Sequence, residues 1–112
     1  MSTDNGPRHY EVLIGDAALE DLRLMRTYLS EQLAAPEAAR RTVAGILDSI
    51  ESLAMMPLRN RIAGTTANGL AIRRARWGKY AILCLVDNEA VRVAAVVYGA
   101  RDLGKVISGI VI

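Results

Sequence analysis

Two long apolar runs near the end of the chain, KYAILCLV at 79–86 and AVRVAAVVY at 90–98, most constrain its fold. Only the turn-forming residues 87–89 separate them, and two aliphatic, β-branched runs joined in this way predict a β-hairpin. Neither run alternates strictly between apolar and polar residues. Both faces of the two strands should therefore be largely covered, as they are for strands in the centre of a sheet.

The first half of the sequence predicts elements that could provide this cover. Residues 9–14 (HYEVLI) alternate as a short strand does, and residues 17–34 and 36–55 keep the apolar spacing of amphipathic helices. Pro36 suits the first turn of the second helix, and Pro57 ends it. Because the connection between the two helices is short, they should form an antiparallel hairpin.

The order of these elements predicts the fold class. Residues 58–69 contain Gly, Asn and Thr and are expected to form a loop, residues 70–77 (LAIRRARW) predict a further strand, and Gly78 breaks it. The result is an α+β domain: an N-terminal strand, an antiparallel α-helical hairpin and a three-stranded antiparallel meander. These strands should form one mostly antiparallel sheet with the helices packed on one face.

The length of 112 residues, 52% of them hydrophobic, suits one domain that can bury a core without disulfides or a metal. Residues 1–8 are polar and are expected to form a flexible arm before a single domain at 9–112, in which the role of 106–112 (VISGIVI) as a further strand stays open. No apolar run reaches the roughly 20 residues of a membrane helix, and the chain does not begin like a signal peptide. We expect a cytoplasmic protein without a membrane partner.

Few residues in the sequence could carry out catalysis. His9 is the only histidine, and Cys84, the only cysteine, lies inside an apolar run, as a buried structural residue would. The strand region offers only Asp87, Glu89 and Asp102 as carboxylates, and no glycine-rich phosphate-binding loop is present. The sequence therefore argues against nucleotide-dependent, metal-dependent and thiol enzymes, and it predicts no metal and no cofactor.

Positive charge is concentrated in one part of the chain. The region from Ser52 to Val86 holds six basic residues and no acidic one, whereas all 12 acidic residues lie outside it. This separation predicts an electropositive patch that could bind phosphates or an acidic protein partner, and a solvated strand face is the alternative. The six basic residues are Arg59, Arg61, Arg73, Arg74, Arg76 and Lys79.

Side chains alternate along a strand, so the arginines of residues 70–77 should divide between the two faces of the sheet. Arg74 and Arg76 should share one face with Ile72, while Arg73 should lie on the opposite face. Trp77 follows at the corner of the hairpin, where it could either anchor the packing or provide a platform for base stacking. We favour the packing role and retain Trp77 among the candidates for target binding.

The first helix carries two apolar stripes, although one stripe would suffice to cover a sheet. If one stripe faces the core, Leu24 and Tyr28, one turn apart, point toward the outer side of the helical hairpin. Beside the alanine-rich second helix, this pair predicts a docking groove. The stripe expected to face the core comprises Leu19, Leu22, Met25 and Leu29.

The apolar region ends in VVYGARDL. Before this ending, the chain contains a helical hairpin that ends in MMP, and then the segment RRARWGKYAILCLVD. Over roughly residues 9 to 103, this arrangement resembles the ParE/RelE superfamily of bacterial toxins from type II toxin–antitoxin modules, whose fold is the one expected above. For Arg101 and Asp102 in this ending, the alternative is an ion pair that only stabilises the end of the strand. The residues that resemble the family's signature terminus are Tyr98, Gly99, Arg101 and Asp102.

The resemblance allows two kinds of activity. RelE-like members are ribosome-dependent messenger RNA endonucleases that use no metal, and their reaction requires a base, cations and an acid. Where the resemblance places an arginine in the central strand, this chain has Ala81, and where it places a tyrosine or histidine past Arg101, this chain reads LGKVISGIVI. Arg101 is always protonated and cannot be a base. The resemblance therefore favours the ParE-like branch, and a binding protein rather than an enzyme.

A ParE-like protein is implied to be a toxin, of the kind linked to plasmid stabilisation, that binds DNA gyrase and is neutralised by a ParD-like antitoxin. In this family the C-terminal segment of the antitoxin wraps the toxin across the hairpin and sheet, so Leu24 and Tyr28 are the candidates for antitoxin binding. The alternatives are a RelE-like ribonuclease and an inactive member that binds only its antitoxin. The target-binding candidates are the six basic residues of the Ser52–Val86 region together with Trp77, Tyr98, Arg101 and Asp102.

Overall fold

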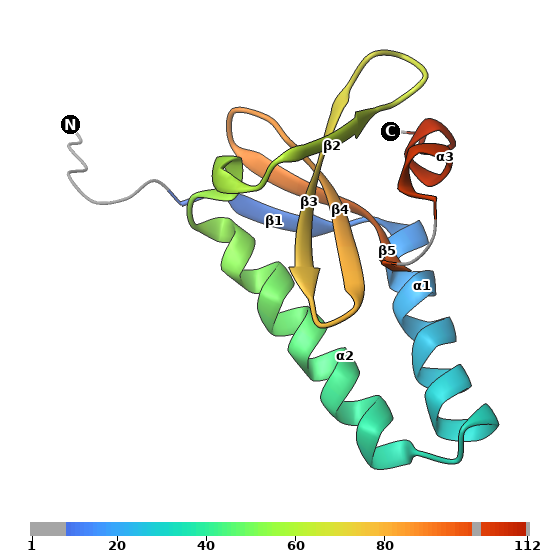
Figure 1. Cartoon of the computed structure of the whole chain (residues 1–112). Coiled ribbons are helices and arrows are strands. Elements are labelled where there is room, and N and C mark those ends of the chain that lie inside the picture. The colour runs from blue at the N-terminus through green and yellow to red at the C-terminus, as the bar shows by residue number, and fades with distance from the viewer. Residues whose placement is uncertain (1–8, 100–101, 112) are drawn as a thin grey trace.

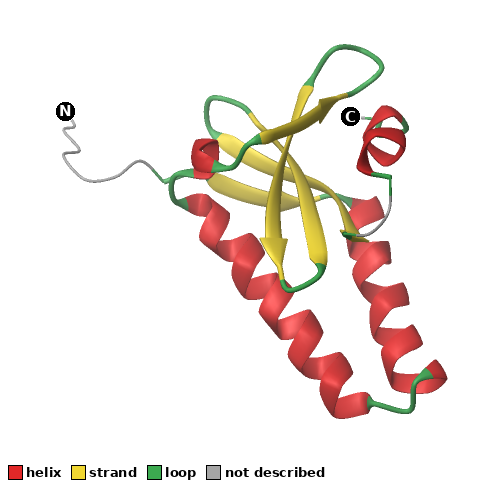
Figure 2. Cartoon of the chain, viewed as in Figure 1, coloured by secondary structure: helices red, strands yellow, loops and turns green. Residues whose placement is uncertain are grey.

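The computed structural model describes residues 9–99 and 102–111. Within these residues, two long helices lie along one side of a twisted sheet (Figure 1). A short helix near the C-terminus lies apart from the two long helices (Figure 1). Figure 2 shows the same arrangement by secondary structure. In chain order the elements are β1 (Glu11–Ile14), α1 (Asp16–Thr27), α2 (Pro36–Glu51), β2 (Ile62–Thr65), β3 (Ala71–Trp77), β4 (Tyr80–Val86), β5 (Ala90–Tyr98) and α3 (Leu103–Ser108).

The sheet has five strands in the order β1-β5-β4-β3-β2 and is mixed. β2 to β5 are antiparallel neighbours, whereas β1 runs parallel to β5, with Glu11 opposite Ala90 and Ile14 opposite Val93. The prediction of an α+β domain with an N-terminal strand, a helical hairpin and a β3–β5 meander is confirmed. The predicted sheet of four strands is wrong by one strand, β2.

The additional strand lies in the segment 58–69 that was expected to be a loop. Strand β2 is a short edge strand in which Ile62 pairs with Arg73 and Gly64 with Ile72, with a bulge between Ile62 and Gly64. Gly64 allows α3 to approach, since a Cβ atom at this position would lie 3.1 Å from Cδ1 of Ile107. The glycine and threonine residues of the segment 58–69 suggested a loop, but Gly64 and Thr65 belong to the edge strand β2, which packs under α3.

The C-terminal segment forms helix α3 rather than a strand, and it packs on the face of the sheet opposite α1 and α2. The prediction that the helices occupy only one face is therefore wrong. Asp102 precedes α3 as its N-cap, because its Oδ1 accepts a hydrogen bond from the backbone N–H of Lys105 at 3.3 Å. Ile107 of α3 is fully buried against the sheet.

The first helix is shorter than predicted, and its buried side differs. It ends at Thr27, and a π-helical turn at Tyr28–Gln32 replaces the predicted continuation to residue 34. Leu22 is buried as expected, but Leu19 is 49% exposed and Ala18 is fully buried in its place. At its N-terminal end, α1 therefore approaches the sheet through a small side chain, which turns Leu19 toward solvent.

Each face of the central strands β4 and β5 packs into its own apolar core, as their nearly continuous apolar sequences predicted. The core between the sheet and the two long helices includes Leu22, Ile46, Ile50, Ile82, Cys84 and Val96. The core beneath α3 includes Ile72, Ala81, Leu83, Ala95 and Ile107.

The contact between α2 and β3 depends on a glycine. Trp77 packs its indole directly against Gly45 of α2, where a Cβ atom would lie only 2.1 Å from Cζ2 of the ring. Glycine lowers helix propensity by about 1 kcal/mol relative to alanine, so its position in the middle of a helix needs a compensating gain. The close approach of Trp77 supplies that gain, and it makes Trp77 a packing residue on the helix-covered face.

We predict that Gly45→Ala destabilises the protein by about 1–3 kcal/mol, because the new methyl group forces Trp77 out of its position. Chemical denaturation would measure the free energy of unfolding. Trp77→Leu removes the clashing ring, so Gly45→Ala should cost less in that background, which a double-mutant cycle would show. A stabilising effect of Gly45→Ala in the wild-type background would contradict this packing.

We also predict that Ile107→Ala lowers the free energy of unfolding by about 2–5 kcal/mol, the usual range for removing a fully buried branched side chain. Val111→Ala is the matched control, since Val111 is 95% exposed and its truncation should change stability by less than about 0.5 kcal/mol. Equal, small effects of the two substitutions would show that α3 does not contribute to the core.

Candidate functional site

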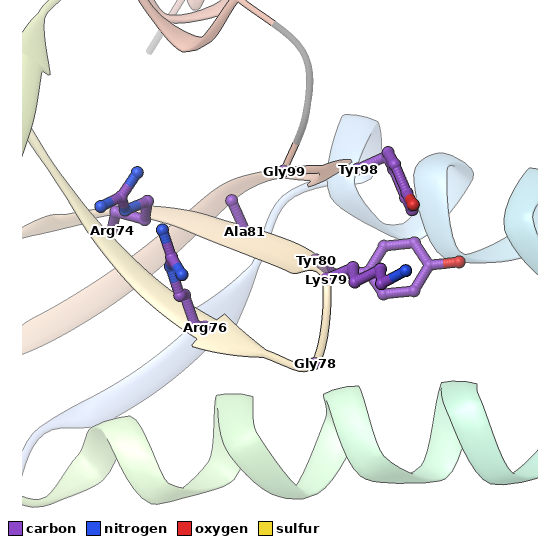
Figure 3. Close-up of a pocket in the computed structure, with 8 residues that line it drawn as sticks. All are labelled: Arg74, Arg76, Gly78, Lys79, Tyr80, Ala81, Tyr98 and Gly99. Carbon is purple, nitrogen blue, oxygen red and sulfur yellow. The ribbon is translucent and has the colours of Figure 1, made fainter.

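Three of the predicted cations surround one pocket, which we call the basic pocket. Arg74 and Arg76 of β3 and Lys79 of the β3–β4 turn line a cavity of about 220 Å³. Figure 3 shows the two guanidinium groups side by side on one face of β3, with Ala81 of β4 next to them. In the part of the chain that the structure describes, no ion pair or side-chain hydrogen bond engages these three cations. Their charge is therefore available to an anion.

Arg73 does not join this pocket. It lies on the opposite face of β3, as the alternation of side chains predicted, and its Nη1 donates hydrogen bonds to the carbonyl oxygens of Leu58 (3.1 Å) and Asn60 (2.7 Å). Two backbone acceptors for one guanidinium hold the segment between α2 and β2 against the sheet. Arg73 is thus placed as a structural residue, apart from Arg74 and Arg76.

The two arginines that precede β2 are exposed and do not line the basic pocket. Arg61 lies beside the cluster, because its carbonyl oxygen accepts the backbone N–H of Arg74 at 3.0 Å. Arg59 ends the short helical turn at Pro57–Arg59, in the segment that Arg73 holds. The six predicted cations therefore divide into a convergent group of three, a neighbour and two residues elsewhere.

A second cavity, which we call the apolar groove, lies between α1 and the end of β5. Leu24 and Tyr28 line it, and they are 51% and 55% exposed. Its volume is about 600 Å³, and the prediction that it would lie beside α2 is wrong, because Val96 and Val97 of β5 form its other wall. The remaining residues of the groove are Asp21, Met25, Leu29, Leu33, Tyr80 and Tyr98.

Tyr80 and Tyr98 line both cavities. They stand opposite each other on β4 and β5, and their rings meet edge to face with centroids 5.7 Å apart and planes at 84°. Burial raises the pKa of Tyr80, and the neighbouring Tyr98 adds to the shift. The Tyr80 hydroxyl therefore stays protonated at neutral pH. Because the two rings line both cavities, the aromatic pair separates the basic pocket from the apolar groove.

The signature terminus does not act as one unit. Tyr98 and Gly99 line the basic pocket, whereas Asp102 caps α3, and Arg101 lies outside the described residues. Gly99 donates its N–H to the carbonyl oxygen of Lys79 at 2.6 Å, and a Cβ atom at Gly99 would lie 2.8 Å from that oxygen. Only glycine allows this close approach of the two backbones, which closes the pocket at the end of β5.

Asp21 is a residue of the groove that the sequence did not indicate. Strand β1 pairs with β5 only as far as Val93, and beyond this point the N–H of Val96 donates to Oδ2 of Asp21 at 2.9 Å. An acidic residue on an amphipathic helix normally faces solvent, so no local pattern marks this contact. Through it, α1 binds the edge of β5 directly.

The described residues provide little for covalent or metal chemistry. Burial raises the pKa of the Cys84 thiol to about 11, so it is neutral at physiological pH. Across residues 9–99 and 102–111, no three His, Cys, Asp or Glu side chains gather as a metal site would need. None of the described helices is long and apolar enough to cross a membrane. The two cavities differ in their linings: three cations line the basic pocket, and mainly apolar residues line the apolar groove.

Comparisons with known proteins agree with this fold. No curated protein sequence matches the chain. Among solved structures, the chromosomal ParDE toxin–antitoxin system from P. aeruginosa is similar to it with a TM-score of 0.62 and 17% sequence identity, over 80% of this chain and 95% of that one. The model of the ParE toxin family, from the type II toxin–antitoxin system parDE, matches residues 12–103. Since this match spans most of the chain, the protein belongs to the ParE toxin family.

Proposed function

We propose that this protein is a growth-inhibiting toxin that a ParD-like antitoxin neutralises by occupying the apolar groove, and that it acts by binding DNA gyrase rather than by catalysis. The observation that carries the proposal is the groove itself. Leu24, Tyr28, Leu33 and Tyr98 are each between 45% and 55% exposed and lie around one cavity in a chain of the ParE family. Clustered apolar surface of this kind usually belongs to a protein interface.

The shape of the groove suits a helical or extended segment of a partner. Its walls are a helix and a strand, so an amphipathic segment could place apolar anchors between Leu24 and Tyr28 on one side and Val96 on the other. The ParDE neighbour in P. aeruginosa is described as a toxin–antitoxin system, which fits an antitoxin as the occupant here.

Binding rather than catalysis is favoured by the residues around the basic pocket. They include no carboxylate and no imidazole, and the guanidinium groups of Arg74 and Arg76 are always protonated and cannot act as a base. Ala81 occupies the position at which a RelE-like ribonuclease would be expected to hold an arginine. These features argue for a toxin that obstructs its target. Gyrase is the target that ParE membership suggests, and the second candidate is a ribosome-dependent ribonuclease.

We predict that replacing Leu24 and Tyr28 by serine weakens binding of the ParD-like antitoxin by roughly 2–4 kcal/mol, because central apolar anchors provide most of the affinity of such interfaces. Titration calorimetry with the antitoxin would measure the change. Leu19→Ser is the matched control: Leu19 lies on the same helix and is 49% exposed, but it does not line the groove. An unchanged affinity of the folded double variant would place the antitoxin elsewhere.

We further predict that expression of the chain alone in a bacterial host causes growth arrest with filamentation and a DNA-damage response, and that co-expression of the antitoxin prevents both. Inhibition of supercoiling by purified gyrase would identify the target directly. Primer extension would reveal transcript cuts in register with codons if the protein were a ribonuclease, and such cuts soon after induction would overturn the proposal. Normal growth would indicate an inactive member that binds only its antitoxin.

A further inference from the structure

We propose that the basic pocket binds the phosphate backbone of a polynucleotide, without reading its sequence. The pocket and the apolar groove use different faces of the sheet. Arg74 and Arg76 lie on the same face of β3 as Ile72, which packs in the core under α3, whereas Leu24 belongs to α1 on the other face. A partner in the groove therefore leaves the guanidinium groups of Arg74 and Arg76 accessible.

The charge of the pocket favours a polyanion. Its lining contains three cations and no acidic residue. Arg74 and Arg76 are two residues apart on one strand, so their side chains project in parallel from points about 6.6 Å apart. This distance is close to the separation of successive phosphates in an extended strand. Each guanidinium can donate two hydrogen bonds to one phosphate, and the Lys79 ammonium can neutralise a third.

The apolar content of the pocket argues against a protein ligand. Tight protein interfaces depend on large apolar or aromatic anchors that enter matching pockets. Between Arg76 and the end of β5 the pocket offers Ala81, which is buried, and Gly99, while the rings of Tyr80 and Tyr98 also line the apolar groove. A polynucleotide needs no such anchor, because release of its counterions by a few cations supplies the binding free energy.

The proposal concerns binding only, and it does not depend on gyrase as the target. The test uses the purified chain with fluorescein-labelled oligonucleotides of one mixed sequence, prepared as single-stranded RNA and as single-stranded DNA, and fluorescence anisotropy between about 50 and 200 mM salt. Three phosphate contacts should give a slope of about −2 in a plot of log K against log salt concentration, since each single-strand contact contributes about 0.7. The two arms show which polynucleotide supplies the phosphates.

The double variant Arg74→Gln/Arg76→Gln should weaken binding at least about tenfold at low salt and reduce the slope to about −0.7, the value for one remaining contact. Arg26→Gln/Arg41→Gln is the control with the same change of charge, on exposed residues of α1 and α2, and it should leave the slope unchanged. Equal losses in both variants, an unchanged slope in the pocket variant, or equally effective competition by polyglutamate of the same total charge would each overturn the proposal.

Discussion

Most side chains of β4 and β5 are apolar on both faces of the sheet, so neither face can be left to water. Burying one branched aliphatic side chain contributes about 1.5–3 kcal/mol, and each face presents several of them. The α1–α2 hairpin covers one face with residues such as Ile46 and Ile50, and α3 covers the other with Ile107. Close packing on both sides needs glycine at two places: Gly45 receives the indole of Trp77, and Gly64 lies under Ile107.

Neither layer of helices covers its face completely, and the two cavities lie where cover ends. On one side, α1 reaches the edge of β5 through the contact of Asp21 with Val96, and past this point the apolar groove is open. On the other side, the basic pocket lies near the β3–β4 turn. The Tyr80–Tyr98 pair separates the two cavities. The region around the Tyr80–Tyr98 pair thus presents an apolar surface on one face of the sheet and a cationic surface on the other.

Features that depend on periodicity could be predicted from the sequence, and features that depend on contacts across the fold could not. Apolar spacing predicted the helical hairpin, the meander and the opposite faces of Arg73 and Arg74. It could not show that Arg73 bonds to two carbonyl oxygens, because its acceptors lie in a segment distant in sequence. Strand β2 has no apolar pattern of its own, because it forms through its pairing with β3. The hydrogen bond between Asp21 and Val96 depends on where β1 stops pairing with β5.

Helix α3 covers only part of β3, and the core on this strand gives way to the site beyond that cover. A six-residue helix is about 9 Å long, whereas the seven residues of β3 extend over about 23 Å, so α3 can cover only part of the strand. Ile72 lies under it and is fully buried, while Arg74 and Arg76, on the same face, lie progressively farther along and become more exposed. These two arginines line the basic pocket, where we propose that a polyanion binds.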